Sequence, residues 1–263
     1  MSAATITVGD GCRLHHRLDG PERAPFLVLS SSLGTDAELW EPQLEVLAES
    51  YRVLRYDMRG HGASDVPVGA YSIDRLVRDV LELLDALDVR GPVRFVGVSL
   101  GGLIGQWLAV RAPERVERLV LANTAAYMGP PEPWQRRIEL VSREGMSAIA
   151  ESVLERWFTP AFRRREIDVV ARARAWLIST SPAGYAGCCA AIRDLDLRPT
   201  ASLIAAPTLL VAGAHDPATP PGRSDELARL LRGSAHVATL EAAHLSNLEQ
   251  PDAFNRALLE FLA

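Results

Sequence analysis

The chain has 263 residues, of which 48% are hydrophobic and 23% are charged, so it can bury a substantial core in one globular unit. Its net charge of −5 gives no electrostatic reason to expect nucleic acid or an anionic membrane as a partner. All 28 basic residues are arginine, which excludes Schiff-base chemistry on a lysine and the lysine-bearing phosphate loop.

The termini and cysteines add further expectations. Met-Ser-Ala-Ala-Thr at the start lacks the basic and apolar regions of a signal peptide, and no apolar run approaches ~18 residues. Cys12, Cys188 and Cys189 have neither the spacing of a metal site nor that of a disulfide framework. We therefore expect a cytoplasmic protein without a metal.

The first half of the chain alternates strand patterns with helical patterns. The turn Gly9-Asp10-Gly11 lies inside an alternating segment, which is typical of a β-hairpin. Apolar residues recur every three or four positions from Ser72 to Leu87, as on one face of a helix. The predicted elements are a hairpin over 4–18, strands over 26–30, 52–56 and 93–98, and helices over 37–50 and 72–87.

One stretch joins a strand directly to a helix, and the rest of the site is predicted around it. Ser99 stands at the corner between the strand and a helical pattern from Leu103 to Arg111, in the pattern G-x-S-x-G. A nucleophile at such a corner sits in a strained conformation and needs small neighbours. The helix that follows points its N–H groups at any anion formed there. We predict that Ser99 is a nucleophile rather than part of a simple Gly/Ser turn.

The strand rhythm breaks in the second half and then returns. After a strand over 118–122, residues 128–197 look helical or irregular, which predicts an inserted helical cap. A strand over 207–213, a helix over 225–232, a strand over 235–240 and a closing helix over 252–262 follow. The alternation predicts an α/β fold with a mostly parallel sheet flanked by helices. Its core would comprise residues 1–127 and 198–263.

A serine nucleophile needs a base to take its proton. His244 follows the last predicted strand, and the carboxyl ends of parallel strands form the active-site edge of such sheets. His61 is the main rival, but its Arg-Gly-His-Gly setting favours a tight turn. The remaining histidines are predicted to be structural or exposed, and they are His15, His16, His215 and His236.

The base in turn needs a carboxylate that holds its tautomer. Asp216 follows the 207–213 strand, although an Asx turn at Asp216-Pro217 is the alternative. Asp57 also ends a strand, but it precedes Ser99 and is predicted to brace the Arg59-Gly60-His61 turn. The order Ser99, Asp216, His244 is that of the α/β-hydrolase fold.

An oxyanion formed at the substrate carbonyl needs two backbone N–H donors. Leu100, which follows the nucleophile, is the first predicted donor. The second is Leu33, in the loop after the 26–30 strand. Many α/β-hydrolases carry His-Gly in that loop, whereas Ser31-Ser32 stands there in this chain.

Six motifs together resemble the 3-oxoadipate enol-lactonases over almost the whole chain. Two stretches narrow the resemblance from the α/β-hydrolases in general to this family. They are the Ser-Leu-Gly-Thr-Asp stretch ending at Asp36 and the Cys-Cys-Ala-Ala-Ile-Arg stretch ending at Arg193. The six motifs are Leu29-Ser-Ser-Ser-Leu-Gly-Thr-Asp36, Tyr56-Asp-Met-Arg-Gly-His-Gly-Ala-Ser64, Gly97-Val-Ser-Leu-Gly-Gly102, Leu121-Ala-Asn-Thr-Ala125, Tyr185-Ala-Gly-Cys-Cys-Ala-Ala-Ile-Arg193 and Ala242-Ala-His-Leu-Ser-Asn-Leu-Glu-Gln250.

The resemblance implies a hydrolase that opens the enol-lactone ring of 3-oxoadipate enol-lactone in the β-ketoadipate pathway of aromatic catabolism. It implies no cofactor, and its partner would be a small anionic lactone. The alternatives are another small-ester hydrolase, a cofactor-free perhydrolase, and a ligand sensor that turns over slowly. The oligomeric state stays open.

Because the implied substrate carries a carboxylate, the cap should supply a partner for it. Trp134 and Arg137 are three residues apart and share a helix face. We predict that Trp134 lines the pocket and that Arg137 faces the carboxylate. The alternative is that Trp134 packs the core of the cap and Arg137 pairs with an acid at the surface.

Overall fold

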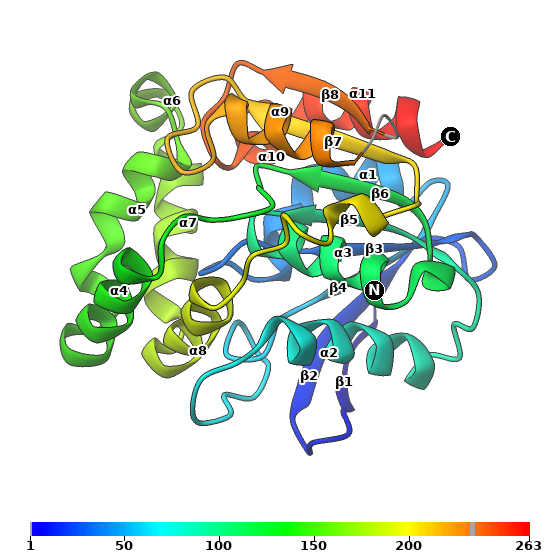
Figure 1. The fold of residues 1–263 in the computed structure, drawn as a ribbon, viewed down its shortest axis with the longest axis horizontal. Helices are drawn as coiled ribbons and strands as arrows, with labels where there is room; N and C mark the ends of the chain where they lie inside the picture. The colour runs from blue at the N-terminus through cyan, green and yellow to red at the C-terminus, as the bar shows by residue number, and fades with distance from the viewer. Residues whose placement is uncertain (1, 232–234) are drawn as a thin grey trace.

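The computed structural model describes residues 2–231 and 235–263, so the predicted end of the 225–232 helix lies outside the described residues. An eight-stranded sheet has the order β1-β2-β4-β3-β5-β6-β7-β8 and is parallel from β4 onward (Figure 1). β1 and β2 form the predicted antiparallel hairpin, and β2 pairs antiparallel with β4. The strands are β1 (Ser2–Thr7), β2 (Arg13–Asp19), β3 (Phe26–Ser30), β4 (Arg52–Tyr56), β5 (Val93–Val98), β6 (Val116–Ala122), β7 (Thr208–Gly213) and β8 (Ala235–Leu240).

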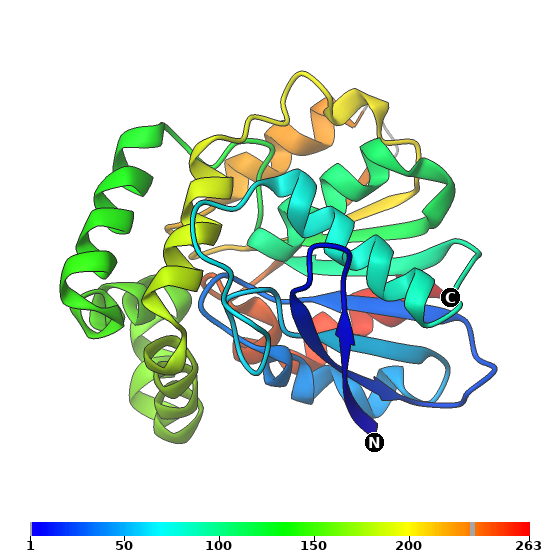
Figure 2. The same ribbon diagram turned by 90° about the horizontal axis from the view of Figure 1, so that it is seen from below.

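The central strands are mostly apolar because helices cover both faces of the sheet, and the charged residues of β5 and β6 lie near the strand starts. All six residues of β7 are buried, as are the last four residues of β5. Figure 2 shows α2, α3 and α9 on one face and α1 and α11 on the other. These helices are α1 (Glu41–Leu47), α2 (Ile73–Ala86), α3 (Leu100–Arg111), α9 (Pro221–Leu230) and α11 (Pro251–Leu262).

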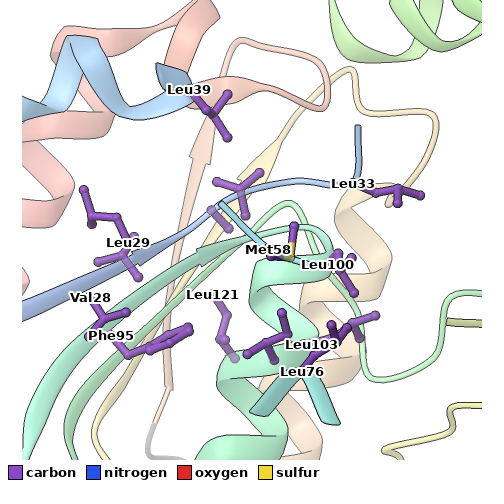
Figure 3. Packing of buried hydrophobic residues seen from close by; sticks show 14 of the residues in the cluster. Val28, Leu29, Leu33, Leu39, Met58, Leu76, Phe95, Leu100, Leu103 and Leu121 are labelled. Atoms are coloured by element: carbon purple, nitrogen blue, oxygen red, sulfur yellow. The ribbon is translucent and has the colours of Figure 1, made fainter. Parts of the chain in front are cut away.

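The core between sheet and helices is a continuous packed cluster. Figure 3 shows Leu76 of α2 and Leu103 of α3 close to Leu121 of β6. In the same view Leu33 stands apart from them, on the loop beyond β3. The apolar core therefore packs beneath the carboxyl ends of the strands, and the loops that carry the polar side chains follow directly after these ends.

Three predicted helices differ in detail, and one helix was not predicted. The helix predicted over 225–232 begins earlier, at Pro221. The helix predicted over 37–50 begins as a 3₁₀ turn, η1 (Ala37–Trp40), which is capped by the Asp36 side chain, and continues as α1 with a proline in its first turn. α3 begins directly after Ser99 rather than at Leu103. A short helix, α10 (Ser246–Glu249), follows His244 and has no counterpart in the predicted elements.

Five helices form a layer at one end of the sheet, on the left in Figure 1. They are α4 (Pro131–Glu144), α5 (Ala150–Trp157), α6 (Pro160–Arg165), α7 (Ile167–Ser179) and α8 (Pro182–Arg193). The Leu197 N–H donates to the Ala126 carbonyl at 2.8 Å, so the chain leaves and rejoins the sheet layer at one point. We call residues 128–197 the cap, and its status as a separate unit stays a prediction. Among the described helices, none combines the length and apolar character needed to cross a membrane.

Candidate active site

Ser99 follows β5 and caps α3 in a conformation that L-residues rarely adopt. Its backbone has φ 57° and ψ −112°. A Cβ on Gly97 would lie 2.2 Å from the Gly101 carbonyl oxygen, and one on Gly101 would lie 2.1 Å from that of Ser30. The two glycines of the motif are therefore required by close backbone approach, which forces the serine outward at the end of the strand.

The structure brings Ser99, His244 and Asp216 into one hydrogen-bonded line. The Ser99 Oγ lies 2.9 Å from His244 Nε2, and His244 Nδ1 lies 2.8 Å from Asp216 Oδ2. All three residues are buried, with exposed fractions of 5% or less. A carboxylate at Nδ1 fixes the tautomer in which Nε2 can accept the serine proton.

Asp216 is held as a carboxylate by several donors. Burial alone would raise the pKa of Asp216. The electrostatic attraction of the His244 ring and the hydrogen bonds from His244 and Thr219 outweigh burial, and they lower the pKa of Asp216 to about 2. The Ala218 and Thr219 amides donate to Oδ1, which is the Asx turn named as the alternative. The Asn123 amide donates to Oδ2 at 3.1 Å. The turn and the contact with the histidine therefore coexist.

Of the two predicted oxyanion donors, Leu33 lines the same pocket as Ser99, and Leu100 directly follows Ser99 as the first residue of α3. Neither amide donates to an acceptor within the described parts of the chain. The Gly34 amide, next to Leu33, donates to His61 Nε2 at 3.0 Å. Burial lowers the pKa of His61 to about 4, so this ring is neutral and accepts, while Nδ1 faces the Arg59 carbonyl. His61 thus lies in a turn, as predicted, and also holds the loop of Leu33.

A cavity of about 230 Å³ opens on Ser99 and His244 beneath the cap. Trp134, Arg137, Arg156 and Tyr185 from α4, α5 and α8 form much of its wall. The wall combines apolar and polar surface in similar amounts, with guanidinium and hydroxyl groups placed among aromatic rings. Such a lining suits a small ligand with an anionic end.

Arg137 faces this pocket and forms no ion pair within the described residues. Its guanidinium lies 5.0 Å from the Trp134 ring centroid and 3.5 Å from the Tyr185 hydroxyl. The Trp134 indole N–H donates to the Met128 carbonyl, which fixes the ring. Of the two alternatives for Arg137, pairing with an acid at the surface is absent from the described contacts.

Arg156 is the second guanidinium in the cavity wall, and it too forms no ion pair in the described chain. Burial and the positive charge of Arg137 lower the pKa of Arg156. Burial raises the pKa of Tyr185 to about 12, so its hydroxyl keeps its proton and can donate. The pocket therefore holds two mutually repelling cations and a hydroxyl donor.

Arg156 is not among the predicted site residues, yet the sequence carries a signal for it. No acidic residue stands three or four positions from Arg137 or Arg156 in either direction. Arg136, in contrast, has Glu132 and Glu139 at those distances. A helical arginine without a local acid is free to serve a site.

The other histidines and Asp57 lie away from this line of contacts. His15 Nδ1 lies 2.9 Å from Asp57 Oδ2, and His215 is exposed and contacts Glu241. Asp57 accepts from the amides of Ala37 and Ala63, so it braces residues beside the predicted turn rather than the turn itself. His16 is buried in β2, and His236 is exposed on β8. The three cysteines are free and buried, and no metal-like cluster of His, Cys, Asp or Glu occurs in the described residues.

Comparison with known proteins agrees with this geometry. The family described as the alpha/beta hydrolase fold matches residues 25–251. The chain is 42% identical to 3-oxoadipate enol-lactonase 2 of Acinetobacter baylyi over 97% of this chain and 94% of that protein. It is 33% identical to a protein of Agrobacterium fabrum provisionally named carbamate hydrolase RutD, over 95% and 96% of the two chains.

The structure also resembles that of the enol-lactonase from Burkholderia xenovorans LB400. The TM-score is 0.96 at 45% identity, and the match covers 98% of this chain and 99% of the other. The chain therefore belongs to the α/β-hydrolase family, and it is an ester or lactone hydrolase related to the 3-oxoadipate enol-lactonases.

Proposed function

We propose that this enzyme hydrolyses the enol-lactone of 3-oxoadipate to 3-oxoadipate, with Ser99 as nucleophile, His244 as base and Asp216 as its carboxylate partner. The observation that carries the proposal is the pair of guanidiniums, Arg137 and Arg156, in the cavity that opens on Ser99. Neither has an acidic partner among the described residues, and both are half-buried, so each charge has lost part of its hydration without gaining a counter-ion. A substrate carboxylate would supply the missing partner.

The chemistry follows from the hydrogen-bonded line. His244 takes the Ser99 proton as Oγ attacks the lactone carbonyl, and the oxyanion accepts from the amides of Leu33 and Leu100. The ring C–O bond then breaks, and His244 gives its proton to the enol oxygen, which stays attached to Ser99 through the acyl chain and becomes the ketone. Water, activated by the same histidine, releases the acyl group from Ser99 and completes the cycle.

The carboxylate would lie at the cap side of the pocket. Arg137, Arg156 and the Tyr185 hydroxyl all donate there, and Trp134 orients Arg137 through its ring face. Bonds between charged partners are among the strongest available for such recognition. They orient the ring carbonyl toward Ser99 and select anionic lactones over neutral esters.

The test compares 3-oxoadipate enol-lactone with its methyl ester, which has the same ring and no charge. We expect many turnovers per enzyme molecule on the acid and a kcat/KM at least roughly 10-fold lower on the ester, since a charge-assisted bond contributes about 1.5–3 kcal/mol. Ser99→Ala should abolish both activities, and a fluorophosphonate should label Ser99. Equal rates on the two substrates would reject the anionic lactone.

A carbamate hydrolase is the second candidate, favoured by the relative that is 33% identical. A carbamate is also a small anion and fits the same two guanidiniums. The two functions are separated by an assay of the same enzyme preparation on a carbamate, in which the rate of carbamate hydrolysis is compared with the spontaneous rate without enzyme. A stoichiometric burst without turnover on every substrate would instead indicate a ligand sensor, and peroxyacid formation with hydrogen peroxide would indicate a perhydrolase.

A further inference from the structure

The backbone that carries His244 is hydrogen-bonded to the cap on both sides of the histidine. We call these contacts the clamp, and it comprises residues 156–159 of the cap, residues 243–245 and the side chain of Glu249. Glu249 lies on α10, immediately after the histidine loop, and only 6% of the residue is exposed. The clamp joins two segments that are about 90 residues apart in sequence.

Glu249 sits at the centre of the clamp and accepts from both segments. Its Oε2 accepts from the Ala243 amide at 3.0 Å and from the Thr159 amide at 3.2 Å. Its Oε1 accepts from the Thr159 hydroxyl. No cation pairs with this carboxylate in the described chain, so neutral donors alone compensate its burial.

The end of α5 supplies the other two bonds of the clamp. The His244 amide donates to the Arg156 carbonyl at 3.4 Å, and the Leu245 amide donates to the Trp157 carbonyl at 3.0 Å. These carbonyls belong to the last turn of a helix, where no intrahelical donor remains. The backbone of Arg156 therefore holds His244 while its side chain faces the substrate cavity.

Packing holds most of this region, but one side of it borders open space. Leu245 is fully buried, whereas Thr159, Ala243 and Glu249 line a second, open pocket of about 540 Å³ that Ser99 does not line. A segment beside open space can shift with a smaller loss of apolar contacts than one that is packed on every side. The hydrogen bonds of the clamp therefore add to side-chain packing in fixing the histidine backbone on that side.

We infer that Glu249 is a positioning residue, which aligns His244 with Ser99 by fixing the histidine loop to the cap. This inference rests on the proposed role of His244 as base. Without the carboxylate, the buried amides of Ala243 and Thr159 lose their common acceptor. The loop then relaxes toward the second pocket, and the 2.9 Å contact between Nε2 and Oγ is no longer maintained.

The experiment compares Glu249→Ala, Glu249→Gln and, as matched control, Glu241→Ala. Glu241 lies in the same loop, but its side chain is 80% exposed. Active sites are titrated to completion with a fluorophosphonate, and kcat and KM on a neutral ester are expressed per titrated serine. We expect a roughly 10- to 100-fold lower kcat for Glu249→Ala, with KM within about twofold of wild type, because small misplacements of catalytic groups cost this much.

Glu249→Gln should recover most of the loss, since one amide oxygen can accept from both backbone N–H groups while the amide N–H faces the Thr159 hydroxyl. Glu241→Ala should match wild type. If Glu249→Ala does not fold, Thr159→Ala removes one bond of the clamp and should lower kcat by a smaller factor at unchanged KM.

A wild-type kcat per titrated serine in the alanine variants, with only a lower melting temperature, would overturn the inference and leave a purely structural role. That result would leave the proposed function intact. The proposed function fails instead if wild-type enzyme is not labelled at Ser99 or turns over neither lactone nor ester.

Discussion

The two guanidiniums of the cavity give the sharpest prediction. Arg137→Ala and Arg156→Ala each remove one donor to the substrate carboxylate, and neither residue forms an ion pair that its loss would break in the described structure. Each lost charge-assisted bond should cost about 1.5–3 kcal/mol, which is roughly 10- to 150-fold in kcat/KM. The double variant should lose less than the product, since both groups serve one carboxylate.

These substitutions should lower activity but should not lower the stability of the free enzyme. Burial and the charge of Arg137 already lower the pKa of Arg156, so the two cations destabilise one another in the free enzyme. Arg156→Ala should therefore keep or raise the melting temperature measured without ligand. A dicarboxylate that resembles the product should raise the melting temperature of wild type and leave that of the double variant unchanged.

The assay measures kcat/KM on the enol-lactone and on its methyl ester for each variant. Arg136→Ala is the matched control, since this neighbour on α4 is exposed. We expect the losses on the acid only, with the ester and the control unaffected. Equal losses on both substrates would refute the argument, because they would show that the arginines support the cap instead of binding the charge.

Three further predictions follow from the buried groups around the site. Asp216→Asn should fold normally and lower kcat by about 10³- to 10⁴-fold, because the amide favours the wrong tautomer of His244; a variant as fast as wild type in steady-state assays would contradict this. As pH falls from about 6.5 to 4, wild type should lose about 3 kcal/mol more unfolding free energy than His61→Phe in urea titrations, because the unfolded chain protonates His61 before the folded one does; equal changes in the two proteins would contradict this. Asp36→Asn should gain about 2–3 kcal/mol at pH 7.5 but not at pH 4, because burial raises the pKa of Asp36 to about 6 and the folded state resists losing that proton; equal urea midpoints for variant and wild type at pH 7.5 would refute it.

The sheet was predictable because its signals are local. The apolar runs of β3, β5 and β7 are short, rich in valine and leucine, and bounded by glycine, proline or serine. The 207–213 and 235–240 strands were placed correctly to within a residue. Helix starts were less certain, because Gly101 and Gly102 have poor helix propensity and still form the first turn of α3. Close approach to Ser30 and Thr124, which no local pattern reveals, selects glycine there.

The candidate site was predictable where it follows from strand ends and not where it depends on packing. Ser99, Asp216 and His244 each follow a strand of the parallel sheet, so their meeting could be expected from topology. Arg156 and Glu249 reach the site only through the docking of α5 and α10, which places a helix end beside the histidine loop. Helical spacing relates Trp134 to Arg137 within α4, but it carries no information on which other helix faces them.

The bond between Leu197 N and Ala126 O has a consequence for how such enzymes can diversify. Because the two ends of the 128–197 excursion meet there, a few glycines could replace it without altering the pairing of β6 with β7. The entropic part of the free energy of closing a loop of n residues grows only as (3/2)RT ln n. Insertions of very different length therefore destabilise the fold by nearly the same amount. Exchange of these residues between relatives is thus a short route to new substrate ranges, provided that the graft retains acceptors for the His244 and Leu245 amides and a donor pair for Glu249.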